Sequence, residues 1–211
     1  MRLAVCVPTS GQCKSTFAYA LAHTAAFFAP GRFSATEDLT VLMQESSVIH
    51  SNREALVDRA LAWNASHVLF VDDDMYWPPK AVLSLMSRDQ PFVACNYPKR
   101  TYPIEFTAIA LDGKRLPTTA ESTGLEECLF AGFGVALIST EIFKALPKPW
   151  FLPGWMDQGN DYTTEDAPLY VRAREAGFVP YIDHDASKMD LGHIGLHVFA
   201  WNHSAEIVHG E

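Results

Sequence analysis

The chain has 211 residues, of which 48% are hydrophobic and 19% are charged, and its formal net charge is −9. These values are those of an ordinary folded domain and exclude a disordered chain. No run of basic residues is longer than Lys99–Arg100, so the sequence shows no broad basic footprint for nucleic acid. If the ligand is an anionic nucleotide, an acidic chain is expected to need a metal ion between the two.

The cysteine and hydropathy patterns predict a cytoplasmic protein without a membrane partner. The longest apolar stretch, residues 18–29, is interrupted by His23 and Thr24 and is shorter than a membrane span. No signal peptide is visible before the first strand-like segment. The chain has four cysteines, Cys6, Cys13, Cys95 and Cys128, and no two of them form a C-x-x-C pair. This spacing favours buried reduced thiols over a zinc ribbon or a disulfide framework.

The first hundred residues alternate strand-like and helix-like segments, the pattern of a parallel α/β sheet. Apolar runs predict strands at residues 3–7, 39–44, 67–71 and 91–95. Three helices are predicted here. The first covers residues 14–28, the second begins at the capping-box pattern Ser51-Asn-Arg-Glu54, and the third begins at Pro78–Pro79.

The second half is less regular. Short strands and turns are expected over residues 101–127, with Asp112–Gly113 as a hairpin turn. Further along the chain we predict a strand at 132–139, a helix at 140–146, an irregular loop at 147–161, a helix at 165–176 ended by Gly177, and a last strand at 179–182.

Three consecutive carboxylates, Asp72, Asp73 and Asp74, directly follow the apolar segment 67–71. Ligands of open α/β sheets bind at the carboxyl ends of the strands. Crowded carboxylates repel one another unless a cation neutralises them, and Mn²⁺ and Mg²⁺ take carboxylate oxygens together with substrate phosphates. In an extended segment Asp72 and Asp74 point to the same side and can share one metal, whereas Asp73 points away. The alternative is a solvated acidic turn before the next helix.

Several further segments follow the aspartates in order. They are Gly132-Phe-Gly-Val-Ala-Leu-Ile-Ser139, Pro149-Trp-Phe151, Thr164-Glu-Asp166, Asp183 and Leu191-Gly-His-Ile-Gly195. Together with the DxD-like segment at residues 67–75, they resemble the glycosyltransferases of GT-A fold, especially the family-2-like group, over most of the chain. The resemblance implies an α/β, Rossmann-like GT-A domain with a mostly parallel central sheet over residues 1–211. Residues 1–100 would then bind the nucleotide and residues 101–211 the acceptor.

The resemblance also implies a reaction, the transfer of one sugar from a UDP- or GDP-sugar to an acceptor hydroxyl with Mn²⁺ or Mg²⁺. Asp74 would be the direct metal ligand, Asp72 would share the metal or lie near the ribose, and His193 would be a third ligand. Asp73 is placed with the nucleotide-binding residues. His193 has two alternatives: a buried histidine bonded to backbone, or a zinc ligand paired with His197 on a helix.

Asp166 is the candidate general base for an inverting transfer, with Glu165 as the other carboxylate that could serve. The alternative for both is a favourable interaction with a helix dipole. By resemblance, the loop Pro8-Thr9-Ser10 would cover the base and ribose. Asn52 and Arg53 could reach the base or the diphosphate, or could form a solvated helix start.

The aromatic residues Trp150, Phe151 and Trp155 could form a platform for a flat acceptor or an ordinary packed loop. The chain lacks the Q-x-x-R-W motif of processive synthases, so a single transfer is expected. The acceptor is left open between a saccharide, a small molecule and a modified nucleobase, and the chain could be a homo-oligomer.

Two other functions stay open. A sugar-phosphate nucleotidyltransferase would need a Gly- and Arg-rich loop after the first strand, which residues 8–12 do not provide. A non-catalytic nucleotide- or sugar-binding module on the same fold is the second.

Overall fold

The computed structural model describes residues 1–29, 38–156, 160–195 and 198–200. Within these residues a mixed sheet of seven strands forms the centre, in the order β2-β1-β3-β7-β5-β10-β6. The strands are β1 (Arg2–Thr9), β2 (Asp38–Glu45), β3 (His67–Val71), β5 (Phe92–Ala94), β6 (Leu125–Glu127), β7 (Val135–Ser139) and β10 (Tyr181–Asp183). β7 and β6 run antiparallel to their neighbours, and the remaining neighbouring pairs are parallel.

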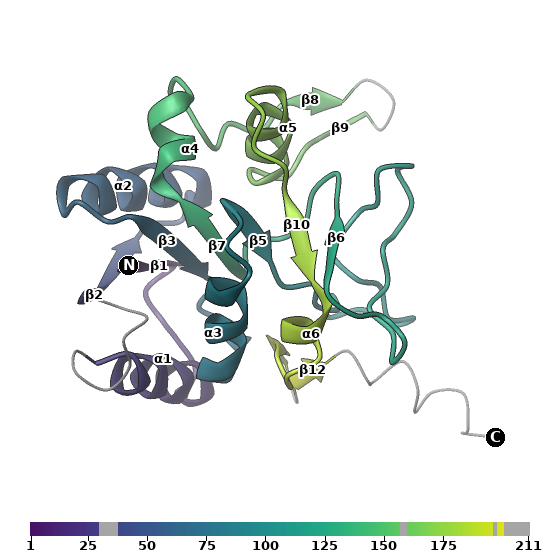
Figure 1. The fold of residues 1–211 in the computed structure, drawn as a ribbon, viewed down its shortest axis with the longest axis horizontal. Helices are drawn as coiled ribbons and strands as arrows, with labels where there is room; N and C mark the ends of the chain where they lie inside the picture. The colour runs from purple at the N-terminus through teal and green to yellow at the C-terminus, as the bar shows by residue number, and fades with distance from the viewer. Residues whose placement is uncertain (30–37, 157–159, 196–197, 201–211) are drawn as a thin grey trace.

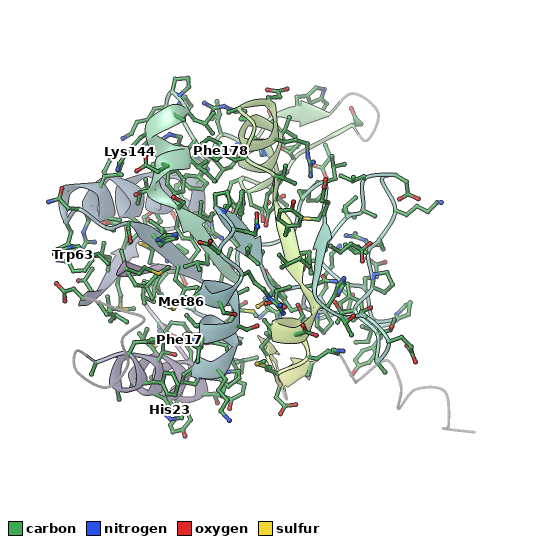
Figure 2. The ribbon with its side chains drawn as sticks, in the orientation of Figure 1. Phe17, His23, Trp63, Met86, Lys144 and Phe178 are labelled. Carbon is green, nitrogen blue, oxygen red and sulfur yellow. The ribbon has the colours of Figure 1, made fainter. Side chains whose placement is uncertain are left out.

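Helices cover both faces of this sheet (Figure 1). One layer holds α1 (Ser15–Phe27), α3 (Pro79–Ser87) and α6 (His184–Ser187), and the other holds α2 (Ile49–Ala62), α4 (Thr140–Ala145) and α5 (Ala167–Glu175). The alternation along β1 divides the core accordingly: Leu3, Val5 and Val7 face the first layer, and Ala4 and Cys6 face the second. Figure 2 shows Phe17 in the first layer, where its ring meets Trp77 edge to face at 5.5 Å.

Two small sheets complete the described part of the chain. β4 (Met75–Tyr76), β11 (Gly192–Ile194) and β12 (Val198–Ala200) form one, and β8 (Trp155–Met156) pairs with β9 (Asp161–Tyr162) in the other. In the part of the chain that the structure describes, no helix is long and apolar enough to cross a membrane.

The predicted α/β architecture is confirmed, and its strands in the first half lie within two residues of their predicted ends. The sheet is less parallel than predicted because β7 enters antiparallel between β3 and β5. Hydropathy shows that Val135–Ser139 is buried but carries no information on strand direction. Strands from both halves of the chain share this one sheet.

Three local predictions are wrong. The second helix begins at Ile49 rather than at a capping box, because Glu54 instead accepts the backbone N–H groups of Trp150 and Phe151. α5 begins at Ala167, after the two carboxylates instead of with them. β10 is not the last strand, because β11 and β12 follow it.

Of the two alternatives for the aromatic residues, the packed loop is the one that Trp150 and Phe151 take. Trp150 and Phe151 are buried in the core, and within the predicted trio only Trp155 is exposed, at 53% of its surface. The loop predicted at 147–161 contains β8 and the start of β9, and its residues 157–159 lie outside the described part.

Candidate active site

The three aspartates leave β3 at the carboxyl edge of the sheet, and the small sheet brings His193 beside them. β11 runs antiparallel to β4, with His193 opposite Met75. The Ile194 backbone N–H donates to the Asp74 carbonyl at 2.6 Å. A strand at Gly192–Ile194 rules out the predicted alternative of a helical zinc pair, and His197 lies outside the described residues. The fold thus joins two segments that the sequence separates by more than a hundred residues.

The His193 ring is oriented by its surroundings. Its Nδ1 lies 2.9 Å from the Pro98 carbonyl oxygen, and its ring meets Tyr97 edge to face at 4.9 Å. Because a carbonyl only accepts, Nδ1 donates to it, which leaves Nε2 as the nitrogen that could bind a metal. A backbone carbonyl on the second nitrogen is the usual way in which proteins orient a metal-binding histidine.

A fully buried arginine connects the aspartates to the carboxylates before α5. Arg53 donates from Nη2 to Asp72 Oδ1 at 2.9 Å and from Nε to Glu165 Oε1 at 3.1 Å. Its guanidinium also lies 5.2 Å from the Phe70 ring centroid and 5.3 Å from that of Phe133. Burial opposes its charge, but Asp72 and Glu165 outweigh burial and raise the Arg53 pKa. Nη1 has no hydrogen-bond partner among the described residues.

Asp166 has the electrostatics of a general base. Its side chain is 7% exposed and accepts a hydrogen bond from the Thr164 hydroxyl. Burial, followed by repulsion from Glu165, raises the pKa of Asp166 from 3.8 to about 6, although Thr164 and Arg53 lower it. Such a carboxylate is ionised at neutral pH yet basic enough to take a proton.

Asp166 opens onto a cleft of about 540 Å³. Thr107, Phe130, Gly132 and Tyr162 line the cleft with it. The buried Thr107 Oγ1 has no hydrogen-bond partner in the described part of the chain, so it could serve a polar ligand.

Tyr97 is a site residue that the sequence analysis missed. It is 2% exposed, and its hydroxyl accepts the Gly134 N–H at 2.7 Å. Burial and the charges of Asp72 and Asp166 raise its pKa well above the usual value, so the hydroxyl stays protonated. A Cβ on Gly132 would lie 2.3 Å from this hydroxyl, and one on Gly134 would lie 2.5 Å from it. The two glycines in the strand motif were the available signal, since paired glycines often mark a close approach.

Asp74 pairs with a second arginine, Arg100, whose Nη2 lies 2.9 Å from Oδ2. Burial raises the pKa of Asp74, as do Asp72 and Asp73, whereas His193 and Arg100 lower it. The carboxylates and the free imidazole nitrogen suit Mn²⁺ or Mg²⁺ in kind. As they stand, no three His, Cys, Asp or Glu side chains among the described residues converge on a common cation position. The metal site therefore stays a prediction.

The loop predicted to cover the base and ribose, Pro8-Thr9-Ser10, lies at the end of β1. Pro8 is buried in β1, Ser10 is exposed, and the Thr9 hydroxyl accepts the Gly11 N–H at 3.0 Å. A hollow of about 260 Å³ is lined there by Thr9, Gly11, Gln12, Cys13, Met43 and Glu45.

Asn52 is hydrogen-bonded to the chain segments beside this hollow. Its amide nitrogen donates to the Thr9 and Ser46 carbonyls, and its oxygen accepts from the Ser46 hydroxyl. Asn52 therefore holds the loop ends in place, and a direct contact with a nucleotide stays a prediction.

Neither a protein-family model nor a curated protein matches the sequence. Among solved structures, the crystal structure of A197 from STIV is similar to this chain with a TM-score of 0.58 and 15% identity. The alignment covers 94% of this chain and 96% of that chain. At this identity the likeness shows a shared fold alone.

Proposed function

We propose that this chain is a metal-dependent glycosyltransferase of GT-A type, which moves one sugar from a nucleotide-diphosphate sugar to an acceptor hydroxyl. The observation that carries the proposal is the buried Arg53, which contacts Asp72 on one side and Glu165 on the other. Arg53 thus joins the aspartate motif and the Thr164-Glu-Asp166 motif into one polar site at the carboxyl edge of the sheet, and its contact with Glu165 spans 112 residues of the chain.

In this proposal the donor lies over the aspartates. A divalent ion held by Asp72, Asp74 and His193 would supply a Lewis acid for the diphosphate leaving group. The chain's own contribution is to hold these groups in place: Arg53 orients Asp72, and the Pro98 carbonyl orients His193. The hollow beside Thr9 would take the nucleoside.

The acceptor would enter the cleft beside Asp166. Asp166 takes the proton of the acceptor hydroxyl as its oxygen bonds to the anomeric carbon. The bond from that carbon to the diphosphate breaks at the same time, and the nucleoside diphosphate leaves. With the base on one side of the reacting carbon and the leaving group on the other, this transfer would invert the configuration. The raised pKa of Asp166, about 6, suits this role near neutral pH.

The test is to incubate the protein with Mn²⁺ and UDP- or GDP-sugars and to identify the products. Free nucleoside diphosphate that is absent with Asp166→Asn supports the proposal. Pyrophosphate released from a sugar phosphate and a nucleoside triphosphate would instead identify a nucleotidyltransferase. Binding of a nucleotide-sugar with no turnover in any acceptor mixture would identify a binding module.

A further inference from the structure

Arg100 forms an ion pair with a residue that the proposed function assigns to the metal. Its Nη2 lies 2.9 Å from Asp74 Oδ2, and its side chain is 48% exposed. The Asp74 side chain is 28% exposed. Because nearly half of the Arg100 side chain faces solvent, its guanidinium can leave Asp74 without opening the core.

The turn that carries Arg100 is held firmly at its base. Pro98 and Phe106 form an antiparallel bridge, and the Lys99 N–H donates to the Glu105 carbonyl at 2.7 Å. The Pro98 carbonyl also accepts from His193. Arg100 therefore projects from a fixed point beside both His193 and Asp74.

The neighbouring cations are either buried or bonded to groups outside the predicted metal site. Arg53 is buried against Asp72 and Glu165. Lys14 Nζ donates to the Ile194 and Gly195 carbonyls, and Lys99 pairs with Glu105 at 3.4 Å. Of these four described cations, Arg100 is the half-exposed one whose partner is the predicted direct metal ligand.

We propose that Arg100 pairs with Asp74 while the site lacks a metal, and binds the donor diphosphate once a divalent ion takes Asp74. This inference rests on the proposed function and assigns a diphosphate-binding residue to it. The ion and Arg100 are both cations and compete for the same carboxylate. A released guanidinium next to the ion is repelled by it and attracted by the diphosphate, whose oxygens match its planar pair of donors.

The experiment measures two affinities in Arg100→Gln. Mn²⁺ binding without nucleotide, followed by isothermal calorimetry, should become tighter by about two- to fivefold, the factor for loss of a partly exposed competing ion pair. Binding of UDP and GDP at saturating Mn²⁺ should become weaker by about 10- to 100-fold, the range for a lost hydrogen bond to a charged group. Arg100→Lys keeps the charge, so its Mn²⁺ affinity should stay near wild type and its nucleotide affinity should fall between the two.

Lys144→Gln is the matched control, since it also removes one cation from a surface ion pair. Lys144 lies on α4 (Figure 2) and pairs with Glu141. α4 follows β7 at Ser139, which is opposite His67 and thus at the other edge of the sheet from the aspartates. Neither affinity should change in this variant.

The outcomes separate the two proposals. If the wild-type protein binds neither Mn²⁺ nor a nucleoside diphosphate, both the proposed function and the role of Arg100 fail. If it binds both, and Arg100→Gln leaves nucleotide affinity unchanged or weakens Mn²⁺ binding, the role of Arg100 is overturned and the proposed function stands.

Discussion

Replacing Asp166 by Asn should make the protein more stable at neutral pH while removing its activity. Folding raises the pKa of this carboxylate from 3.8 to about 6. The folded state therefore holds the proton more tightly, and ionising Asp166 costs stability as the pH rises from about 4 to about 6. Asn resembles the protonated acid and can still accept the hydrogen bond from Thr164. It avoids that cost.

The size of the gain follows from the pKa. Each tenfold change in an ionisation constant is about 1.4 kcal/mol, so Asp166→Asn should gain about 3 kcal/mol at pH 7.5 and about 1 kcal/mol at pH 4.5. Urea unfolding followed by far-UV circular dichroism at both pH values measures this. Asp112→Asn is the control: a hydrogen bond from Lys114 lowers the pKa of Asp112 on its exposed turn, so that variant should gain nothing at pH 7.5.

An equal gain for Asp166→Asn at both pH values, or none at pH 7.5, would refute the reasoning, because it would mean that the buried carboxylate does not titrate near 6. The same variant should lower turnover by about 10²–10⁴ with donor binding retained. The activity of the wild-type protein should rise with pH through about 6, as Asp166 ionises.

Three further predictions concern the rest of the site. Gly132→Ala and Gly134→Ala should each cost about 1–3 kcal/mol of unfolding free energy, because the new Cβ would overlap Tyr97. Tyr97→Phe should relieve Gly132→Ala but not Gly134→Ala, since the added Cβ lies 3.1 Å from the ring carbon Cζ in the first and 2.6 Å in the second. Arg53→Met should cost about 3 kcal/mol or more, because it leaves two carboxylates unpaired. Asp74→Ala should abolish Mn²⁺-dependent nucleotide binding and leave the circular dichroism spectrum unchanged.

Controls and contrary results are specific to each. Gly154→Ala meets its nearest atom at 3.8 Å and should be close to neutral. If Tyr97→Phe restored the stability of Gly132→Ala and Gly134→Ala equally, the different distances from the two added Cβ atoms to Tyr97 Cζ would be contradicted. Wild-type stability in Arg53→Met would show that the arginine is not a bridge, and unchanged nucleotide affinity in Asp74→Ala with Mn²⁺ would remove the metal from that residue.

Local patterns were enough to place most of the elements. The strand at His67–Val71 was predicted to the residue, and Gly177, with φ +89°, ends α5 as predicted. The error at the second helix arose because a side chain has a distant partner. Glu54 was assigned to a helix cap, but it binds the backbone of Trp150 and Phe151, almost a hundred residues away.

Local patterns also predicted part of the candidate site. An apolar strand that runs directly into three aspartates marks a sheet edge whatever the rest of the chain does. That His193 lies beside Asp74 was only implied by resemblance, and the antiparallel pairing of β11 with β4 is what brings them together.

The sequence by itself determined which segments are buried, and therefore that Asp72, Asp73 and Asp74 leave the sheet at one edge. Burial repeats along a strand or a helix, so it can be read from neighbouring residues. Only the tertiary structure decided the antiparallel course of β7, the bridge that Arg53 makes to Glu165, the hydrogen bond of Tyr97 with Gly134 and the pairing of Arg100 with Asp74. These contacts join residues far apart in the chain, and packing, not local periodicity, selects such partners.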